Sequence, residues 1–325
     1  MKILVAGAGG FIGGHLVNSL INKQNEVVAV DRKNFDEWFQ INPLSSNHDN
    51  IDLKDFFNCQ KFTKNTDQVI NLACDMGGIG FITSFKTECM LSVFVNTNLL
   101  KASLENNIKK YLFSSSACVY PNNLQTNNKS LALKEADAYP ADCQDGYGWE
   151  KLFSERMTRH FNEDYNLDTR IARFHNCYGP FSSWNDGREK APAALARKFV
   201  EAKELKKKEI EIWGNGEQLR SFMYVDDAIA GIEKLMNINY NHPLNIGSSE
   251  DISINKLVDI LEEISGIKLK RNYDLNAPQG VFNRNSDNTL IKQITNWEPS
   301  IKIKDGMEKT YKWIYDEFKK INFKK

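Results

Sequence analysis

The sequence has no excess of either charge, because 42 lysine and arginine residues balance 42 aspartate and glutamate residues. A protein without net charge has little long-range field to recruit nucleic acid or an anionic membrane surface. No apolar run approaches the length of a membrane span either. We therefore expect neither a nucleic-acid partner nor a membrane attachment.

Histidine is scarce and cysteine is scattered. The five histidines form no His-x-x-x-His pair and no His/Cys cluster, so the sequence offers no metal site. The six cysteines form no Cys-x-x-Cys pair, which is typical of free thiols in a reducing compartment. The apolar start of the chain contains glycines that suit a strand-to-helix turn better than a secretion signal. We expect a cytoplasmic protein without bound metal.

Glycine, in contrast, is concentrated just after the first apolar run. Residues 2–6 predict a strand, and Gly7, Gly10 and Gly13 follow in a Gly-x-x-Gly-x-x-Gly pattern that opens a helical segment. Such glycines let a strand-to-helix turn bring backbone N–H groups onto a pyrophosphate, at the positive end of a helix dipole. The motif alone does not exclude a glycine-rich turn without a ligand.

The second predicted strand, residues 26–30, ends at Asp31. A carboxylate about 20 residues beyond such glycines binds the adenosine ribose and repels a 2′-phosphate, so NAD is favoured over NADP. Arg32 argues slightly the other way. Asp52, expected at the end of a third strand, is either an adenine contact or a turn residue. The cofactor-binding candidates are Gly7, Gly10, Phe11, Ile12, Gly13, Asp31, Asp52 and Ala73, together with Tyr147 and Lys151.

The pattern of strands and helices predicts an α/β fold. Further strands at residues 68–73 and 110–114 alternate with helical segments, which is typical of a Rossmann-type, doubly wound parallel sheet. The alternation breaks up after Tyr178. We expect residues 1–178 to form an NAD-binding domain, with a return segment near 220–240. Residues 179–325 would mainly form a smaller substrate-binding domain, with a discontinuous boundary.

A serine, a tyrosine and a lysine form a candidate proton relay. Ser116 lies near the end of the fifth predicted strand, while Tyr147 and Lys151 are four residues apart at the start of a helix. That spacing puts both side chains on one helical face. A nearby lysine ammonium stabilises a phenolate, so that the tyrosine can take a hydroxyl proton. As a bare pattern, Tyr-x-x-x-Lys is usually only a surface pair; the dinucleotide motif upstream favours catalysis.

These motifs resemble those of the extended short-chain dehydrogenase/reductases over nearly the whole chain. Residues 7–13, Ser116, Tyr147 and Lys151 carry the general pattern. Residues 173–180, 220–227 and 245–247 resemble the branch that acts on nucleotide-sugars. Within that branch the chain looks most like the GDP-mannose 3,5-epimerases, through residues 71–78, 115–121, 187–192 and 284–288.

The resemblance implies an epimerisation through a transient C4 ketone. Tyr147 and tightly bound NAD would make that ketone, which acidifies the neighbouring C–H bonds, and would later reduce it. Inverting C3 or C5 then takes a base on one face and an acid on the other. The resemblance assigns this pair to Cys118 and Lys190. From the residues alone, Cys118 would be a small buried hydrophobe and Lys190 a solvated loop lysine.

The same resemblance implies contacts to a GDP-linked sugar. Arg220 and Arg284 are candidates for the diphosphate, since a guanidinium suits bidentate contact with phosphate; the alternative is a structural ion pair. His175 is expected to be a packed strand residue. The other substrate-binding candidates are Gly77, Ser116, Asn176, Glu189, Lys190, Lys198 and Gln218.

Some features remain open. Residues 35–55 have no close match to the epimerase pattern, and Phe282 and Asn283 differ from it beside the expected nucleotide site, so the base is uncertain. The sugar is either a mannose or a manno-heptose, with one or both of C3 and C5 inverted. The apolar helices expected at residues 91–105 and 147–165 would, by resemblance, pair in a homodimer.

Three other interpretations compete with this one. A nucleotide-sugar 4,6-dehydratase would have an acidic pair where this chain has Ala117 and Cys118. A nucleotide-sugar 4-epimerase would have no use for Cys118 with Lys190. The third class is a catalytically inactive NAD-binding sensor or scaffold, which would not need an intact Ser-Tyr-Lys set.

Overall fold

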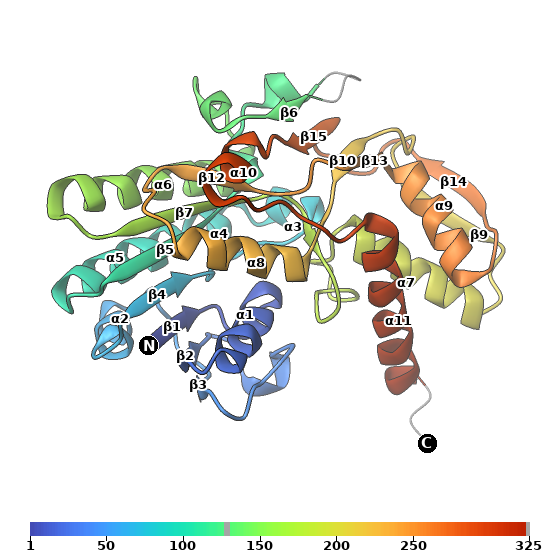
Figure 1. The fold of residues 1–325 in the computed structure, drawn as a ribbon. Coiled ribbons are helices and arrows are strands. Elements are labelled where there is room, and N and C mark those ends of the chain that lie inside the picture. The colour runs from blue at the N-terminus through green and yellow to red at the C-terminus, as the bar shows by residue number, and fades with distance from the viewer. Residues whose placement is uncertain (127–130, 323–325) are drawn as a thin grey trace.

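A seven-stranded parallel sheet forms the centre of the molecule in the computed structural model, which describes residues 1–126 and 131–322. Its strand order is β3-β2-β1-β4-β5-β7-β12 (Figure 1). The strands are β1 (Lys2–Ala6), β2 (Glu26–Val30), β3 (Ser46–His48), β4 (Gln68–Asn71), β5 (Lys110–Ser116), β7 (Thr169–Phe174) and β12 (Pro243–Ile246). The predicted doubly wound fold is confirmed.

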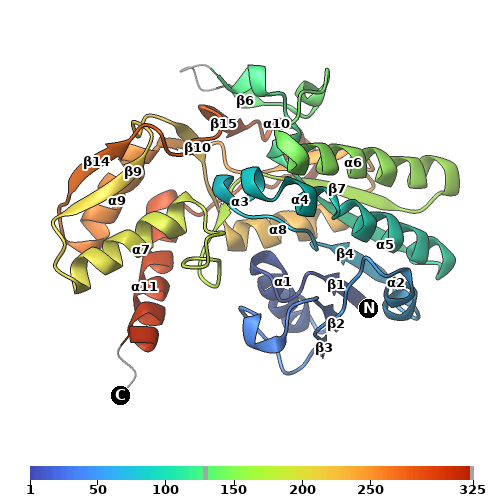
Figure 2. The same ribbon diagram turned by 180° about the vertical axis from the view of Figure 1, so that it is seen from behind.

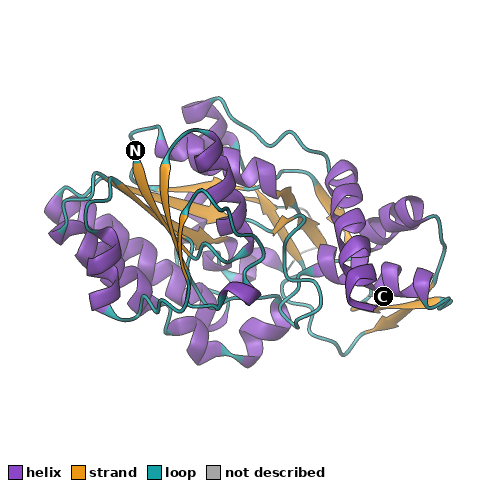
Figure 3. Cartoon of the chain, turned by 90° about the horizontal axis from the view of Figure 1, so that it is seen from below, coloured by secondary structure: helices purple, strands orange, loops and turns teal. Residues whose placement is uncertain are grey.

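Helices cover both faces of this sheet, as the hydrophobic strands require. The helices α1 (Phe11–Asn22) and α8 (Val225–Met236) pack together on one face. The other face is covered by α2 (Phe56–Thr63), α5 (Val93–Glu105) and α6 (Asp145–Tyr165). Figure 3 shows the strands enclosed between the two helical layers. The carboxyl ends of all seven strands therefore meet at one edge, where α/β proteins bind ligands.

A second region has its own hydrophobic core. The helices α7 (Ala191–Glu204), α9 (Ile254–Ser265) and α11 (Ile303–Asn322) pack with the paired strands β9 (Glu209–Trp213) and β14 (Lys270–Asp274). Two residues of the sequence mark the ends of α9. The Ser253 hydroxyl accepts a hydrogen bond from the Lys256 N–H at 3.1 Å, and Gly266 ends the helix with a φ of 72°.

Short strands connect the two regions. One small sheet has the order β13-β10-β15-β6, from β13 (Asp251–Ser253), β10 (Leu219–Ser221), β15 (Asn283–Ser286) and β6 (Ala132–Leu133). A second pairs β8 (Cys177–Tyr178) with β11 (Met223–Tyr224). The remaining helices are α3 (Ile79–Ser84), α4 (Lys86–Met90) and α10 (Thr289–Thr295).

The end of the third strand and the return of the chain to the large sheet were both subjects of prediction. The third strand ends at His48, so the prediction that Asp52 ends it is wrong; Asp52 instead starts a turn in which its Oδ1 accepts from the Lys54 N–H at 2.9 Å. The chain returns to the large sheet through α8 and β12, and the domain limits stay a prediction. In the described ranges 1–126 and 131–322, no helix has the length and apolar character to span a bilayer.

Candidate active site

Two pockets meet at the carboxyl edge of the large sheet. The cofactor pocket is bordered by the segments that follow β1, β2 and β4. The substrate pocket extends from β5 towards α7, β9 and β10. Ser116, Tyr147 and Lys190 line both pockets. Every predicted site residue lines one of the two pockets except Lys151, which lies buried beside Tyr147.

The glycine turn leaves space that only glycine can provide. Gly7 has a φ of 82°, in the left-handed region that favours glycine. A Cβ atom on Gly13 would lie 2.1 Å from the Gly7 carbonyl oxygen, and one on Gly7 would lie 2.8 Å from the Ala73 nitrogen. The first turn of α1 has no acidic residue and no side-chain cap at Gly10. Its N–H groups suit a pyrophosphate, so these residues fit a dinucleotide.

The adenosine end of the cofactor pocket contains Asp31, directly after β2. Its carboxylate accepts hydrogen bonds from the backbone N–H groups of Gly9 and Lys33, both at 3.0 Å. Burial raises the pKa of Asp31, and these bonds oppose the rise. The neighbouring Arg32 is engaged in an ion pair with Asp75, at 2.9 Å from Nη1 to Oδ2. A carboxylate beside an engaged arginine suits the ribose hydroxyls of NAD.

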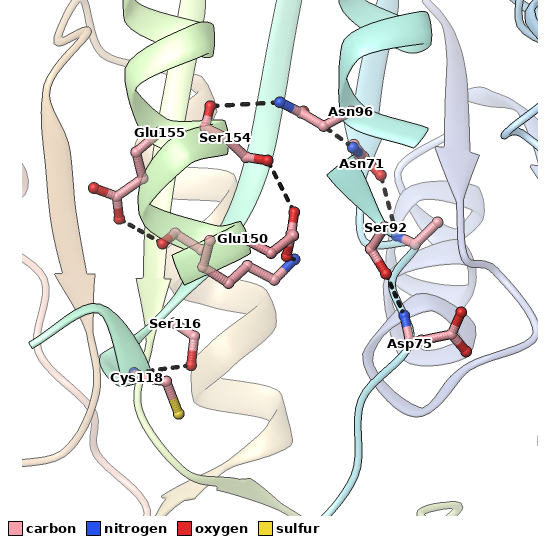
Figure 4. A network of polar contacts seen from close by, with 12 residues as sticks. Asn71, Asp75, Ser92, Asn96, Ser116, Cys118, Glu150, Ser154 and Glu155 are labelled. Atoms are coloured by element: carbon pink, nitrogen blue, oxygen red, sulfur yellow. Dashed lines mark hydrogen bonds and ion pairs between the residues drawn. The ribbon is translucent and has the colours of Figure 1, made fainter. Parts of the chain in front are cut away.

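The candidate proton relay is assembled where the two pockets join. Ser116, the last residue of β5, lines both pockets together with Tyr147. The Ser116 hydroxyl accepts a hydrogen bond from the Cys118 N–H at 3.2 Å (Figure 4). The Lys151 ammonium lies 5.6 Å from the centre of the Tyr147 ring. Burial raises the pKa of Tyr147, so proton abstraction depends on nearby positive charge to stabilise the phenolate.

Sequence reasoning missed Glu150 and Cys74, which surround Lys151. Glu150 is 3% exposed; its Oε1 accepts from the Ser154 hydroxyl at 2.8 Å, and its Oε2 lies 3.4 Å from the Lys151 ammonium (Figure 4). Burial lowers the pKa of Lys151, but Cys74 and Glu150 raise it by more, and the net shift is upward. Lys151 therefore stays charged. The available signal was that Glu150 follows Tyr147 by three residues on the same helical face.

Cys118 and Lys190 come from distant segments and line the same substrate pocket. Cys118 lies in a short 3-10 turn after β5, with its Sγ 3.2 Å from Nη1 of Arg284. Lys190 directly precedes α7 and has an extended backbone. Cys118 is 8% exposed, and its sulfur lies directly beside the charged guanidinium. Cys118 is thus buried, as a small hydrophobe would be, but it contacts a charged group.

Two arginines occupy neighbouring positions in the small sheet. Arg220 and Arg284 are paired in register on the parallel strands β10 and β15. Arg284 also donates to the side-chain oxygens of Gln125 at 2.7 Å and Gln144 at 2.9 Å, while Arg220 donates to backbone carbonyls. Burial and the charge of Arg284 lower the pKa of Arg220 to about 9. Two adjacent guanidiniums held by neutral acceptors suit an anionic group such as a diphosphate.

The remaining substrate candidates line the same pocket, with Gly77 among them. Four of them have a protein partner, which is Ser221 for Asn176, Glu211 for Lys198, Arg197 for Glu189 and Gln279 for Gln218. A substrate would therefore add to, or replace, existing hydrogen bonds. His175 is 2% exposed, as expected for a packed strand residue.

The NAD dependent epimerase/dehydratase family matches residues 3–247. The chain belongs to this family. The GDP-mannose 3,5-epimerase of Arabidopsis thaliana is 40% identical over 321 residues, which are 98% of this chain and 84% of that protein. The similarity noted in the sequence motifs is therefore confirmed across nearly the full length.

Solved structures share the fold of this NAD-dependent family. The UDP-glucose 4-epimerase of Thermotoga maritima has a TM-score of 0.88 at 24% identity, with 98% of this chain and 100% of that chain covered. A UDP-glucuronic acid 4-epimerase of Bacillus cereus, solved with UDP-glucuronic acid and NAD, has a TM-score of 0.81 at 26% identity and the same coverage. The predicted cofactor, NAD, is confirmed; the roles of individual residues stay predictions.

Proposed function

We propose that this family member is a nucleotide-sugar epimerase that inverts C3, C5 or both in GDP-mannose or GDP-manno-heptose. The observation that carries the proposal is that Cys118 and Lys190 share one pocket with Tyr147 and Ser116. A 4-epimerase needs only the last two. The similarity to a GDP-mannose 3,5-epimerase supports the same substrate class.

The reaction begins at the C4 hydroxyl of the sugar. Bound NAD supplies a reversible hydride acceptor for C4. Ser116 holds the hydroxyl in line, and Tyr147 takes its proton while the Lys151 ammonium stabilises the phenolate. The resulting ketone acidifies the C–H bonds at C3 and C5. With NAD bound, the hydride would return to C4 and Tyr147 would return the proton to the C4 oxygen, so that no external redox partner is required.

Cys118 and Lys190 carry out the inversion. One removes a proton from the carbon beside the ketone, and the other delivers a proton to the opposite face of the enolate. We assign Cys118 as the base, since its sulfur lies in the substrate pocket, 3.2 Å from the Arg284 guanidinium. The Lys190 ammonium then serves as the acid. Arg220 and Arg284 together hold the diphosphate, which fixes the sugar between the two groups.

Product analysis tests this function against its rivals. Purified enzyme is incubated separately with GDP-mannose, GDP-manno-heptose and UDP-glucose, and the configuration of each product is determined by NMR. We expect GDP-sugars inverted at C3 or C5. Inversion at C4 alone would indicate a 4-epimerase, and loss of water would indicate a dehydratase. No conversion of any substrate would favour an inactive NAD-binding protein.

We also propose that the chain acts as a homodimer in the cytoplasm. Exposed apolar side chains gather on α4, α5 and α6, which lie side by side in Figure 2. These side chains are Met90, Phe94, Trp149 and Phe153, together with Leu91 directly after α4. An exposed apolar face of this kind is typical of a protein interface. The double variant Trp149→Glu/Phe153→Glu should sediment as a monomer. Tyr165→Glu, at the other end of α6, should sediment as the wild type does.

A further inference from the structure

Residues 184–190, here called the strap, lead into α7 and carry Lys190. Arg197, one of the residues of α7, holds the strap to its own helix. Its Nε donates to the Trp184 carbonyl at 2.9 Å, and its Nη2 forms an ion pair with Glu189 at 3.1 Å. These contacts fix the strap from the side of the second region.

Arg188 fixes the strap from the other side. Its carbonyl accepts the Gly78 N–H at 2.9 Å, and its Nη1 lies 3.4 Å from the Met76 carbonyl. Its guanidinium also lies 4.0 Å from the centre of the Phe81 ring, within the range of a cation–π contact. Residues 76–81 follow β4, so Arg188 joins the strap to the cofactor-binding sheet two residues before Lys190.

The approach at Gly78 is too close for any other residue. A Cβ atom there would lie 2.5 Å from the Glu189 carbonyl oxygen. Gly78 has a φ of −67°, which any residue adopts readily. The backbone conformation therefore does not require glycine at this position. Glycine is required instead because the backbone of the strap at Glu189, the residue before Lys190, lies against Gly78.

We infer that Arg188 is a positioning residue for proton transfer by Lys190, an inference that rests on the proposed function. A lysine side chain is long and flexible, so its reach depends on a fixed backbone. The contacts of Arg188 with Gly78 and Phe81 fix that backbone where the two pockets join. Tyr147 shares an apolar cluster with Phe81, but within the described ranges no hydrogen bond joins Tyr147 or Ser116 to Arg188 or Gly78. Arg188 therefore governs exchange at the inverted carbon and leaves oxidation at C4 intact.

Two readouts from one reaction separate these steps. The holoenzyme is mixed with GDP-mannose in D₂O under single-turnover conditions. Absorbance of the reduced nicotinamide reports oxidation at C4, and NMR reports deuterium at C3 and C5. Arg188→Ala should slow deuterium incorporation on the order of 100-fold, as expected for a displaced catalytic group, with C4 oxidation within about twofold of wild type. Arg188→Lys should recover part of the exchange, because it keeps a cation over the Phe81 ring.

A second variant tests the same contact without removing a charge. Gly78→Ala should push the strap away and reproduce the loss of exchange with C4 oxidation retained. Arg271→Ala, which breaks an ion pair between Arg271 of β14 and Asp259 of α9, is the matched control and should behave as wild type.

Each outcome has one meaning. Loss of C4 oxidation in parallel with exchange, or unchanged exchange in both Arg188→Ala and Gly78→Ala, would overturn the positioning role. A wild-type enzyme that oxidises or exchanges neither GDP-mannose nor GDP-manno-heptose would instead overturn the proposed function, and with it this inference.

Discussion

The two pockets differ in how their residues are distributed along the chain. Gly7, Gly13 and Asp31, which shape the cofactor pocket, lie within one strand-helix-strand unit. The substrate pocket combines Cys118 with Lys190 and Arg284, which belong to distant segments. A local motif has a physical meaning of its own, since its spacing alone sets its geometry. The geometry of a pocket made from distant segments is set only by the tertiary fold, so it cannot be predicted from local spacing.

The largest expected effect is at Tyr147, where the two pockets join. Tyr147→Phe keeps the ring but removes the proton acceptor, and general acid–base catalysis is worth roughly 10²–10⁴-fold in rate. We expect C4 oxidation and deuterium exchange to fall together by that amount. Tyr165→Phe, at the exposed end of the same helix, is the control. If Tyr147→Phe lost only one of the two steps, Tyr147 would not be the shared entry to the reaction.

Variants of the proposed acid–base pair in the substrate pocket should lose proton exchange at C3 and C5 but keep the oxidation at C4. Cys118→Ala and Lys190→Met should each reduce deuterium exchange by roughly 10²-fold or more, with oxidation at C4 retained. Stopped-flow absorbance and NMR on the same samples measure the two steps. Cys59→Ala, a buried cysteine on α2, controls for the loss of a thiol. A variant of either residue that exchanges as fast as wild type would remove that residue from the mechanism.

A buried histidine, His175, lines both pockets, and we expect it to make the stability of the protein depend on pH. His175 is buried there, its ring 3.2 Å from the Asn245 amide oxygen, and burial lowers its pKa to about 3 from 6.5. The folded protein therefore keeps His175 neutral, while the unfolded chain binds a proton below about pH 6.5. Proton binding by His175 in the unfolded chain therefore does not affect the free energy of unfolding above that pH. Below it, this binding lowers the free energy of unfolding by about 1.4 kcal/mol per pH unit as the pH drops towards 3.

Urea unfolding at about pH 7 and pH 5 measures this contribution. His175→Asn should remove about 2 kcal/mol of the decrease seen in the wild type. His242→Gln, which changes an exposed histidine, should leave the decrease unaltered. An equal decrease in His175→Asn and wild type would show that His175 titrates normally in the folded protein.

Among the effects on the reaction and on binding, the smallest is expected at the adenosine end of the cofactor pocket. Asp31→Asn removes a charge-assisted contact to the ribose, and such a bond is worth about 1.5–3 kcal/mol. NAD affinity should fall roughly ten- to hundredfold, and the preference for NAD over NADP should narrow. Calorimetric titration of the stripped enzyme measures both. Asp36→Asn, at an exposed position nearby, should bind NAD normally. Unchanged affinity in Asp31→Asn would place the ribose elsewhere.

The parts of the molecule that follow local rules were predictable. Alternating strands and helices gave the doubly wound sheet, and Ser253 and Gly266 marked both ends of α9. Tyr147 and Lys151 were identified because helical spacing alone brings them together. Cys118 and Lys190 could be paired only through a resemblance, since no local rule connects a residue after β5 with one before α7.

The contacts that sequence reasoning missed depend on tertiary structure. The ion pair between Arg32 and Asp75 crosses two loops, and the contact between Arg284 and Cys118 joins the small sheet to the large one. Arg188 had no signal beyond its place in a matching segment, because its partner Phe81 lies over 100 residues earlier. The third strand was misplaced because Ser46–His48 is short and largely polar, which gives little hydrophobic pattern to detect.

We propose above all that Cys118 and Lys190 exchange protons on a sugar whose C4 hydroxyl has first been oxidised, with Tyr147 as the base and bound NAD as the hydride acceptor. Purified enzyme, without added NAD, is incubated with GDP-mannose or GDP-manno-heptose in D₂O and followed by proton NMR. We predict deuterium at C3, C5 or both, together with a sugar of inverted configuration at the same carbon. Absence of deuterium from both carbons in both substrates, even after NAD is added, would contradict the account.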